Sequence, residues 1–201
     1  MLQQSGKGIA VTGSGAATPT SYLDNQGLIH LVDTTDEWIT NRTGIRQRRL
    51  ALSTDSVCSL ATTAARDAIA MAGIAAQELD LIILATSTAD DLFGTASLIQ
   101  GQLGAKQAVA FDLTAACSGF VFGMVTAAQF IRTGVYRHVL VIGADILSRW
   151  VDWSDRGTCI LFGDGAGAIV MQASDSDRLL GFELRSDGSQ NHYLNLAYQG
   201  E

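Results

Sequence analysis

The sequence predicts an α/β fold in which helices cover both faces of a mixed β-sheet. Short apolar segments alternate with stretches of helical periodicity, which is the pattern of layered α/β folds. Two of the segments, 81–84 and 139–142, are apolar at every position, which is typical of strands buried on both faces. With 201 residues, 47% of them hydrophobic, the chain is long enough to bury a sizeable core.

Six segments of the chain predict strands: 9–12, 79–86, 108–113, 139–144, 166–172 and 180–185. Only a short polar segment, SDSDR, and no helix lies between the last two. That spacing predicts an antiparallel hairpin at one edge of the sheet.

Two stretches predict long helices. Apolar residues recur at helical spacing over residues 55–72, and Gly73 ends this helix. Residues 118–133 are apolar almost all round, which predicts a second helix that is buried on every side and closed by Gly134.

The composition indicates that part of the surface is covered by something else. Charged residues make up 16% of the chain, against about 25% in an average soluble domain, so we expect burial against further chain or a second subunit. The final residues, NLAYQGE, carry no stop signal, and we expect that the chain is cut within a domain.

Several functional classes are disfavoured. A net charge of −7 argues against nucleic-acid binding, and the longest apolar stretch, 119–131, is too short to span a bilayer. No secretory signal is visible at the N-terminus. The three cysteines (Cys58, Cys117 and Cys159) are odd in number and widely spaced, which predicts neither disulfides nor a metal site and favours a cytoplasmic protein.

Cys117 is the candidate nucleophile. A predicted strand ends near Leu113 and a predicted helix begins near Ser118, so Cys117 lies at a sharp turn that the small residues Ala115 and Gly119 permit. The positive end of the helix dipole favours a thiolate there, and free backbone N–H groups can receive an oxyanion. The alternative is a buried structural cysteine, which is our interpretation of Cys58 and Cys159.

Two glycine-rich segments, 13–18 and 163–167, imitate nucleotide-binding loops but lack the residues that such loops need. We predict tight turns at both. Four arginines form a basic run: Arg42, Arg46, Arg48 and Arg49. Two interpretations of this run stay open: a local site for anions, or a loop neutralised by nearby acids (Asp33, Asp36 and Glu37).

Three long motifs together resemble one family. DLTAACSGF (residues 112–120), DTTDEWITNRTGIRQRR (33–49) and WSDRGTCILFGDGAGA (153–168) look like β-ketoacyl-acyl-carrier-protein synthase III, the initiating condensing enzyme of fatty-acid synthesis. The resemblance runs through essentially the whole chain in family order. It implies a thiolase-like fold, of which residues 1–201 would be the N-terminal half, with the second half absent.

The resemblance implies a site for coenzyme A. Trp38 and Arg42 match the pair that contacts the adenine nucleotide, and Arg156, with Gly157 beside it, matches the residue that closes the other side of the adenine. Thr34 matches a polar contact near the same nucleotide. A flat indole suits an adenine ring, and arginines suit its phosphates.

The resemblance also implies a reaction. Cys117 matches the nucleophile that accepts an acyl group from acetyl-CoA and passes it to malonyl-acyl-carrier protein with loss of carbon dioxide. Phe93 matches the residue that crosses a homodimer to line the acyl pocket, to which Phe162 is also assigned. Acetyl-CoA is a substrate here, so no cofactor and no metal are expected.

The family's catalytic His and Asn lie in the second half of the fold. His30 (expected in a short helix), His138 (before a strand) and His192 (in a polar loop) match neither, so we expect no condensation from this chain alone. Two alternatives remain open: another synthase of the thiolase superfamily with a different acyl-CoA, and a non-catalytic dimerisation fragment.

Overall fold

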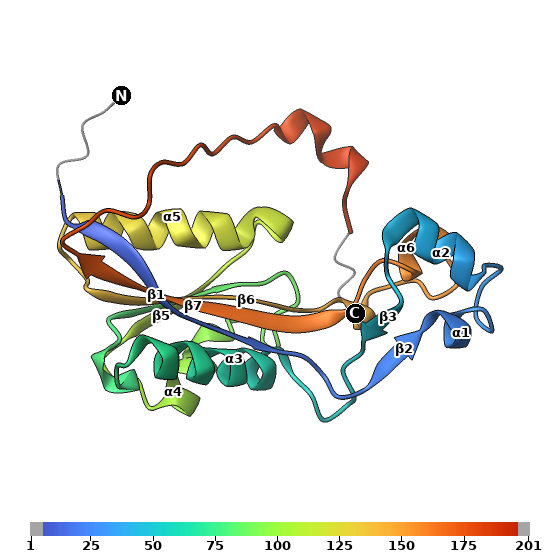
Figure 1. Ribbon diagram of the computed structural model, residues 1–201, viewed down its shortest axis with the longest axis horizontal. Helices are drawn as coiled ribbons and strands as arrows, with labels where there is room; N and C mark the ends of the chain where they lie inside the picture. The colour runs from blue at the N-terminus through green and yellow to red at the C-terminus, as the bar shows by residue number, and fades with distance from the viewer. Residues whose placement is uncertain (1–5, 197–201) are drawn as a thin grey trace.

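The computed structural model describes residues 6–196. Its centre is a five-stranded mixed sheet in the order β1-β7-β6-β4-β5 (Figure 1). Strands β4, β5 and β6 run parallel, whereas β7 is antiparallel to both β1 and β6. The strands are β1 (Gly8–Ala17), β4 (Leu81–Ala85), β5 (Val109–Leu113), β6 (His138–Ile146) and β7 (Asp164–Ser174).

Helices cover both faces of this sheet, as the sequence predicts. Helices α3 (Val57–Ala72) and α4 (Ala96–Leu103) lie on one face, and α5 (Gly119–Arg132) lies on the other (Figure 1). In β4, Ile82 and Leu84 belong to the α3 core, whereas Leu81 and Ile83 belong to the α5 core. Because neighbouring side chains of a strand point to opposite faces, a strand between two helix layers has to be apolar throughout.

Local signals set the ends of α3. The Ser56 side chain accepts a hydrogen bond from the Ser59 backbone N–H, and the Ser59 side chain accepts one from the Ser56 backbone N–H. This pair of bonds forms a capping box at the N-terminus. Gly73 ends the helix with φ at 68°, a left-handed conformation that glycine adopts without strain. The predicted helix over residues 55–72 is therefore confirmed, with its start two residues later.

Helix α5 corrects one expectation. Its inner side is fully buried through Ala127, Ala128 and Ile131, but Val121 on the other side is 49% exposed. The prediction that the helix is buried all round is wrong for the described residues, because the sheet covers only one of its sides.

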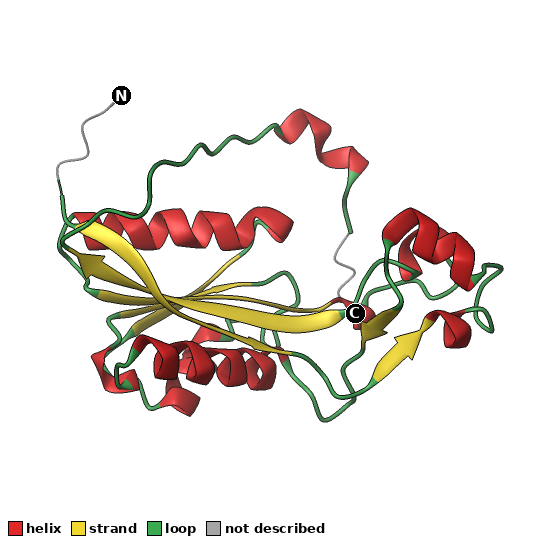
Figure 2. Cartoon of the chain, viewed as in Figure 1, coloured by secondary structure: helices red, strands yellow, loops and turns green. Residues whose placement is uncertain are grey.

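The predicted hairpin is also wrong. Residues 180–185 form no strand, and the chain after β7 is drawn as loop up to the 3₁₀ helix η4 (Gly188–Tyr193) (Figure 2). Strand β7 already pairs with β1 along one side and with β6 along the other. No free edge of β7 remains for a following strand.

The two glycine segments lie in strands and not in the predicted turns. Residues 13–17 belong to β1, and 164–167 to β7, after Gly163. A Cβ atom at Gly13 would lie 2.0 Å from the Ala68 carbonyl oxygen, and one at Gly15 would lie 2.1 Å from the Ala64 carbonyl oxygen. These glycines let α3 approach the backbone of β1 closely.

A small unit is attached at one end of the sheet (Figure 1), which we call the peripheral unit. Its own core contains Leu28, Ile39, Cys159 and Ile160. Strands β2 and β3 form a separate antiparallel pair in it. Its elements are β2 (Tyr22–Asp24), α1 (Asn25–Leu28), α2 (Asp36–Thr43), β3 (Gln47–Arg49) and α6 (Arg156–Cys159).

Three further 3₁₀ helices are η1 (Ala76–Glu78), η2 (Ala116–Ser118) and η3 (Leu147–Arg149). Within residues 6–196, none of the helices has the length and apolar character that crossing a membrane requires.

Candidate active site

Cys117 lies at the tight turn that the sequence predicts. Strand β5 ends at Leu113, Cys117 is the middle residue of η2, and α5 begins two residues later. Ala116 has φ at 45°, a left-handed conformation that costs a non-glycine residue energy and that concentrates at functional sites. A Cβ atom at Gly119 would lie 3.2 Å from the Ala85 Cβ, so glycine lets α5 start against β4.

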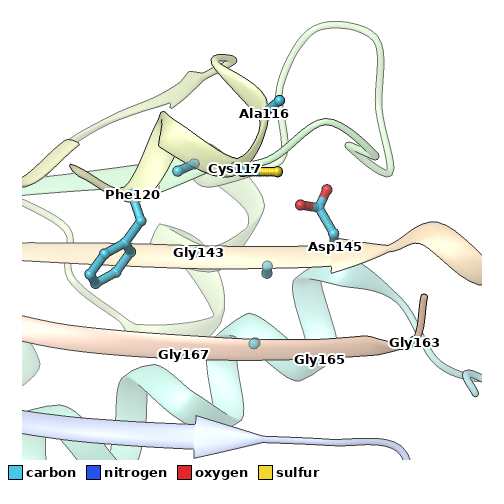
Figure 3. A pocket seen from close by; sticks show the side chains of 11 residues that line it. Ala116, Cys117, Phe120, Gly143, Asp145, Gly163, Gly165 and Gly167 are labelled. Atoms are coloured by element: carbon cyan, nitrogen blue, oxygen red, sulfur yellow. The ribbon is translucent and has the colours of Figure 1, made fainter. Parts of the chain in front are cut away.

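The Cys117 side chain is exposed and lines a cavity of about 270 Å³ (Figure 3). Phe120 of α5 lies on one wall, and Gly143 of β6 and Gly167 of β7 form part of another. A Cβ atom at Gly143 would lie 3.1 Å from the Phe120 ring, so this glycine makes room for the aromatic side chain. On β6 and β7 the cavity is lined mainly by small residues.

Asp145 is a polar residue of this cavity that the sequence analysis did not predict. Its Oδ1 accepts hydrogen bonds from Thr86 Oγ1 (3.2 Å), the Ser87 backbone (2.8 Å) and Thr88 Oγ1 (2.9 Å). Its carboxylate and the Cys117 sulfur face the same space in Figure 3. The one available signal was a carboxylate near the end of an otherwise apolar strand.

The other two cysteines are in different environments. Cys58 is half-buried in α3, where burial raises the pKa of its thiol. Cys159 is fully buried in the peripheral unit, and burial raises the pKa of that thiol as well. Cys159 belongs to a hydrophobic core and Cys58 packs against one, in agreement with our interpretation of them as core residues, which leaves Cys117 as the exposed cysteine.

The structure brings together the predicted aromatic and cationic residues. The guanidinium carbon of Arg42 lies 4.5 Å from the centre of the Trp38 ring, and that of Arg156 lies 4.9 Å from it. Arg156 Nη1 also donates to the Asp33 carbonyl oxygen at 3.1 Å. An indole with two guanidinium groups against it offers flat surfaces and positive charge at one place.

Thr34 and Gly157 lie in the same unit. The Thr34 hydroxyl is buried and has no hydrogen-bond partner among the described residues. The Gly157 backbone N–H donates to Asp155 Oδ1 at 2.8 Å and so helps to start α6, the helix that carries Arg156. Their predicted contacts with a nucleotide stay predictions.

The basic run is not one site. Arg42 and Arg46 are exposed, Arg48 is buried, and Arg49 donates to the carbonyl oxygens of Pro19 and Thr20. No ion pair joins these arginines to the neighbouring acids among residues 6–196. The interpretation of a loop neutralised by acids is therefore not supported by contacts.

Phe93 and Phe162 do not line the Cys117 cavity in the described part of the chain. Phe93 is 97% exposed and lies before α4 beside a second cavity of about 360 Å³, which Phe111 and Asp112 also line. Phe162 is half-buried after α6. The predicted roles of both in an acyl pocket stay predictions.

The three histidines lie outside the cavity that Cys117 lines. His30 lies in the turn after α1 and not inside a helix, because α1 ends at Leu28. His138 is the first residue of β6, with Nδ1 2.9 Å from the Glu78 carbonyl oxygen. The His192 ring lies 4.1 Å from the Tyr193 ring in η4.

No metal-binding cluster of His, Cys, Asp or Glu is found within residues 6–196.

Comparisons with known proteins point to one family. Residues 111–188 match the family model described as 3-oxoacyl-[acyl-carrier-protein (ACP)] synthase III. The chain is 74% identical over 96% of its length to the β-ketoacyl-[acyl-carrier-protein] synthase III of Nostoc sp., and 65% identical over its whole length to that of Acaryochloris marina. It spans only 58% and 60% of the length of these two relatives.

Solved structures agree. A synthase III from Pseudomonas aeruginosa superimposes with a TM-score of 0.91 at 40% identity, covering 96% of this chain and 62% of that one. A synthase III from Aquifex aeolicus has a TM-score of 0.82 at 50% identity, covering 84% and 55%. The resemblance carried by the three motifs and the predicted fold class are thereby confirmed.

Proposed function

We propose that this chain, which is similar to β-ketoacyl-acyl-carrier-protein synthase III throughout its length, supplies the acyl-accepting part of that reaction. The observation that carries the proposal is the position of Cys117, an exposed thiol at a strained turn before a 14-residue helix and beside a cavity.

The first step is an acyl transfer. The Cys117 sulfur attacks the thioester carbonyl of acetyl-CoA, a new carbon–sulfur bond forms, and coenzyme A leaves as a thiolate that takes up the proton of the cysteine. Backbone N–H groups at the start of α5 are suited to hold the negative oxygen that develops. Trp38, Arg42 and Arg156 would bind the adenine nucleotide of coenzyme A, with Thr34 and Gly157 beside them.

The second step is the condensation. Malonyl-acyl-carrier protein loses carbon dioxide, and the resulting carbanion attacks the Cys117 thioester to give a 3-oxoacyl product. In the family this step uses a His and an Asn that match no residue of this chain. We therefore assign condensation to the complete enzyme, a cytoplasmic homodimer in which Phe93 and Phe162 contribute to the acyl pocket.

One observation favours a second candidate. The chain is also similar to the priming β-ketosynthase of the R1128 polyketide pathway, at 35% identity and a TM-score of 0.83. The higher identity to synthases III favours acetyl-CoA as the primer. A polyketide-type enzyme would prefer another acyl-CoA.

A panel of acyl-CoAs tests the proposal. Each radiolabelled acyl-CoA is incubated with the protein, and the label retained after denaturation is counted. We expect retention close to one acetyl group per chain, and none in Cys117→Ala. Preference for a longer or branched acyl group would favour the polyketide-type enzyme, and no retention from any donor would favour a non-catalytic fragment.

A further inference from the structure

Arg48 is a buried cation in the peripheral unit. It is 4% exposed, and no ion pair with it is found among the described residues. Its Nε is also buried without a hydrogen-bond partner in the described chain. Burial lowers the pKa of its guanidinium, an effect that nearby Cys159 and Asp24 partly oppose. An apolar side chain of similar size would be cheaper to bury, so stability alone does not account for an arginine here.

The hydrogen bonds of Arg48 join its own strand, β3, to two other segments of the chain, residues 23–25 and Ile160. Its Nη1 donates to the Leu23 carbonyl oxygen at 3.2 Å. Its Nη2 donates to Asn25 Oδ1 at 3.0 Å and to the Ile160 carbonyl oxygen at 3.1 Å. The planar, forked guanidinium fixes the relative positions of these acceptors.

One acceptor leads to the helix that carries Trp38. Asn25 Nδ2 donates to Asp36 Oδ1 at 2.7 Å and to the Ile45 carbonyl oxygen at 2.9 Å. Asp36 is the first residue of α2, and Ile45 follows the end of that helix. Through Asn25, Arg48 is therefore connected to both ends of α2.

Another acceptor leads to the helix that carries Arg156. Ile160 is the C-cap residue of α6, a helix of only four residues that begins with Arg156. Such a short helix holds its position through its contacts and not through its own stability. A hydrogen bond from Arg48 to its C-cap thus helps to fix where Arg156 lies.

We propose that Arg48 is a positioning residue of the nucleotide site: by linking α2 to α6 it holds Trp38 and Arg156 next to one another in the site proposed for the adenine nucleotide of coenzyme A. The inference rests on the proposed function of that site. Arg48 touches neither the nucleotide nor the reacting atoms in this account, and it acts through Asn25 and Ile160.

Substitution of Arg48 separates positioning from general folding. Arg48→Gln and Arg48→Met should weaken binding of coenzyme A at least tenfold by titration calorimetry. Alkylation of Cys117 by iodoacetamide should stay within twofold of the unsubstituted rate, because the central sheet is untouched. The matched control is Arg49→Gln on the same strand, whose side-chain hydrogen bonds within residues 6–196 go to the carbonyl oxygens of Pro19 and Thr20. It should bind coenzyme A within twofold of the unsubstituted protein.

Two results would overturn the proposal: affinity for coenzyme A within twofold in both Arg48 variants, or loss of affinity together with fast alkylation of Cys58 and Cys159, which would indicate general unfolding. If neither variant folds, Arg48→Lys is measured instead. It keeps the charge, but one ammonium is too compact to reach all three acceptors, so it should bind coenzyme A less tightly than the Arg49 control.

A failure of the proposed function gives a different result. In that case the unsubstituted protein itself does not bind coenzyme A. The positioning role is then decided by the NMR signal of the Trp38 indole N–H, assigned with Trp38→Phe. The signal should move in the Arg48 variants and stay in place in Arg49→Gln, and an unmoved signal would refute the role.

Discussion

At the scale of single residues, the three cysteines show how environment separates chemistry from packing. Cys159 is buried and Cys58 is half-buried, and burial raises the pKa of both thiols, whereas Cys117 is exposed. The sequence analysis reached this assignment from the position of each cysteine in its predicted element. It missed Asp145, because a carboxylate near the end of an apolar strand is a weak signal until the fold places it at the cavity that Cys117 lines.

The cysteines should differ in the pH dependence of their alkylation. Since burial disfavours the thiolate, Cys58 and Cys159 should react slowly with iodoacetamide near neutral pH and faster only as the pH rises. Cys117 should be labelled first at pH 7, as measured by mass spectrometry of peptides over time. Faster labelling of Cys58 than of Cys117 would contradict this order.

The contacts around Trp38 predict the energetics of nucleotide binding. Trp38→Ala and Arg156→Ala should each weaken acyl-CoA binding by about 1–3 kcal/mol, the scale of a lost stacked pair or charged hydrogen bond. The matched control is Arg46→Ala, an exposed arginine of the same run outside the stack. Unchanged affinity in both test variants by calorimetry would place the ligand elsewhere.

At the scale of elements, close approach of α3 to β1 depends on glycine. Gly15→Ala should lower the free energy of unfolding by about 1–3 kcal/mol or more, because the added methyl group meets the α3 backbone. Gly101→Ala in α4 is the matched control: its Cβ enters open space, so it should raise stability by about 0.5–1 kcal/mol. Urea unfolding measures both, and equal effects would refute the packing argument.

An ion pair links α5 to the chain after β7. Arg132 lies 2.7 Å from Asp177, and this hydrogen bond lowers the pKa of the Asp177 carboxyl below its usual value. A carboxyl whose pKa is lowered by folding stabilises the protein fully at pH values above its pKa in the unfolded chain, about 3.9. This stabilisation is lost as the pH falls through the pKa of the carboxyl in the folded protein.

Asp177→Asn should therefore cost up to about 1 kcal/mol of unfolding free energy at pH 7, and the difference should shrink below about pH 4. The control is Glu183→Gln, whose pair with Arg185 is highly exposed and should contribute nothing measurable. A difference that stays constant or grows in acid would show that the Asp177 charge is not responsible.

Elements with strong local patterns could be predicted from the sequence, and elements set by pairing could not. Strands β4 and β6 and helix α3 follow from apolar periodicity and capping residues. The error at residues 180–185 arose because pairing of β7 with β1 joins residues that are 149 to 166 positions apart in the sequence. The peripheral unit was missed as a unit because its core joins short elements from distant parts of the chain, such as Ile39 and Ile160.

At the scale of the whole molecule, the described chain carries the proposed nucleophile, Cys117, and a helix with one apolar side open to solvent. Val121 of α5 and Phe93 before α4 are exposed, which agrees with a low content of charged residues. None of the three histidines reaches the Cys117 cavity. The chain spans about 58–60% of the synthases III that it matches.

This arrangement predicts what the 201-residue polypeptide does by itself. It should be oligomeric or poorly soluble. It should also release no labelled carbon dioxide from malonyl-acyl-carrier protein above background, because none of its residues matches the catalytic His or Asn of the family. A soluble monomer with measurable turnover would mean that a residue within the chain fills the histidine role. His192, in a polar segment, would then be the first residue to substitute.

The central claim is that Cys117 accepts the acyl group, and peptide mapping after incubation with acetyl-CoA tests it most directly. The account predicts one added acetyl group on the peptide that contains Cys117, none on those with Cys58 or Cys159, and loss of the label in Cys117→Ala. Acetylation of Cys58 or Cys159 instead, or label that persists in Cys117→Ala, would contradict it.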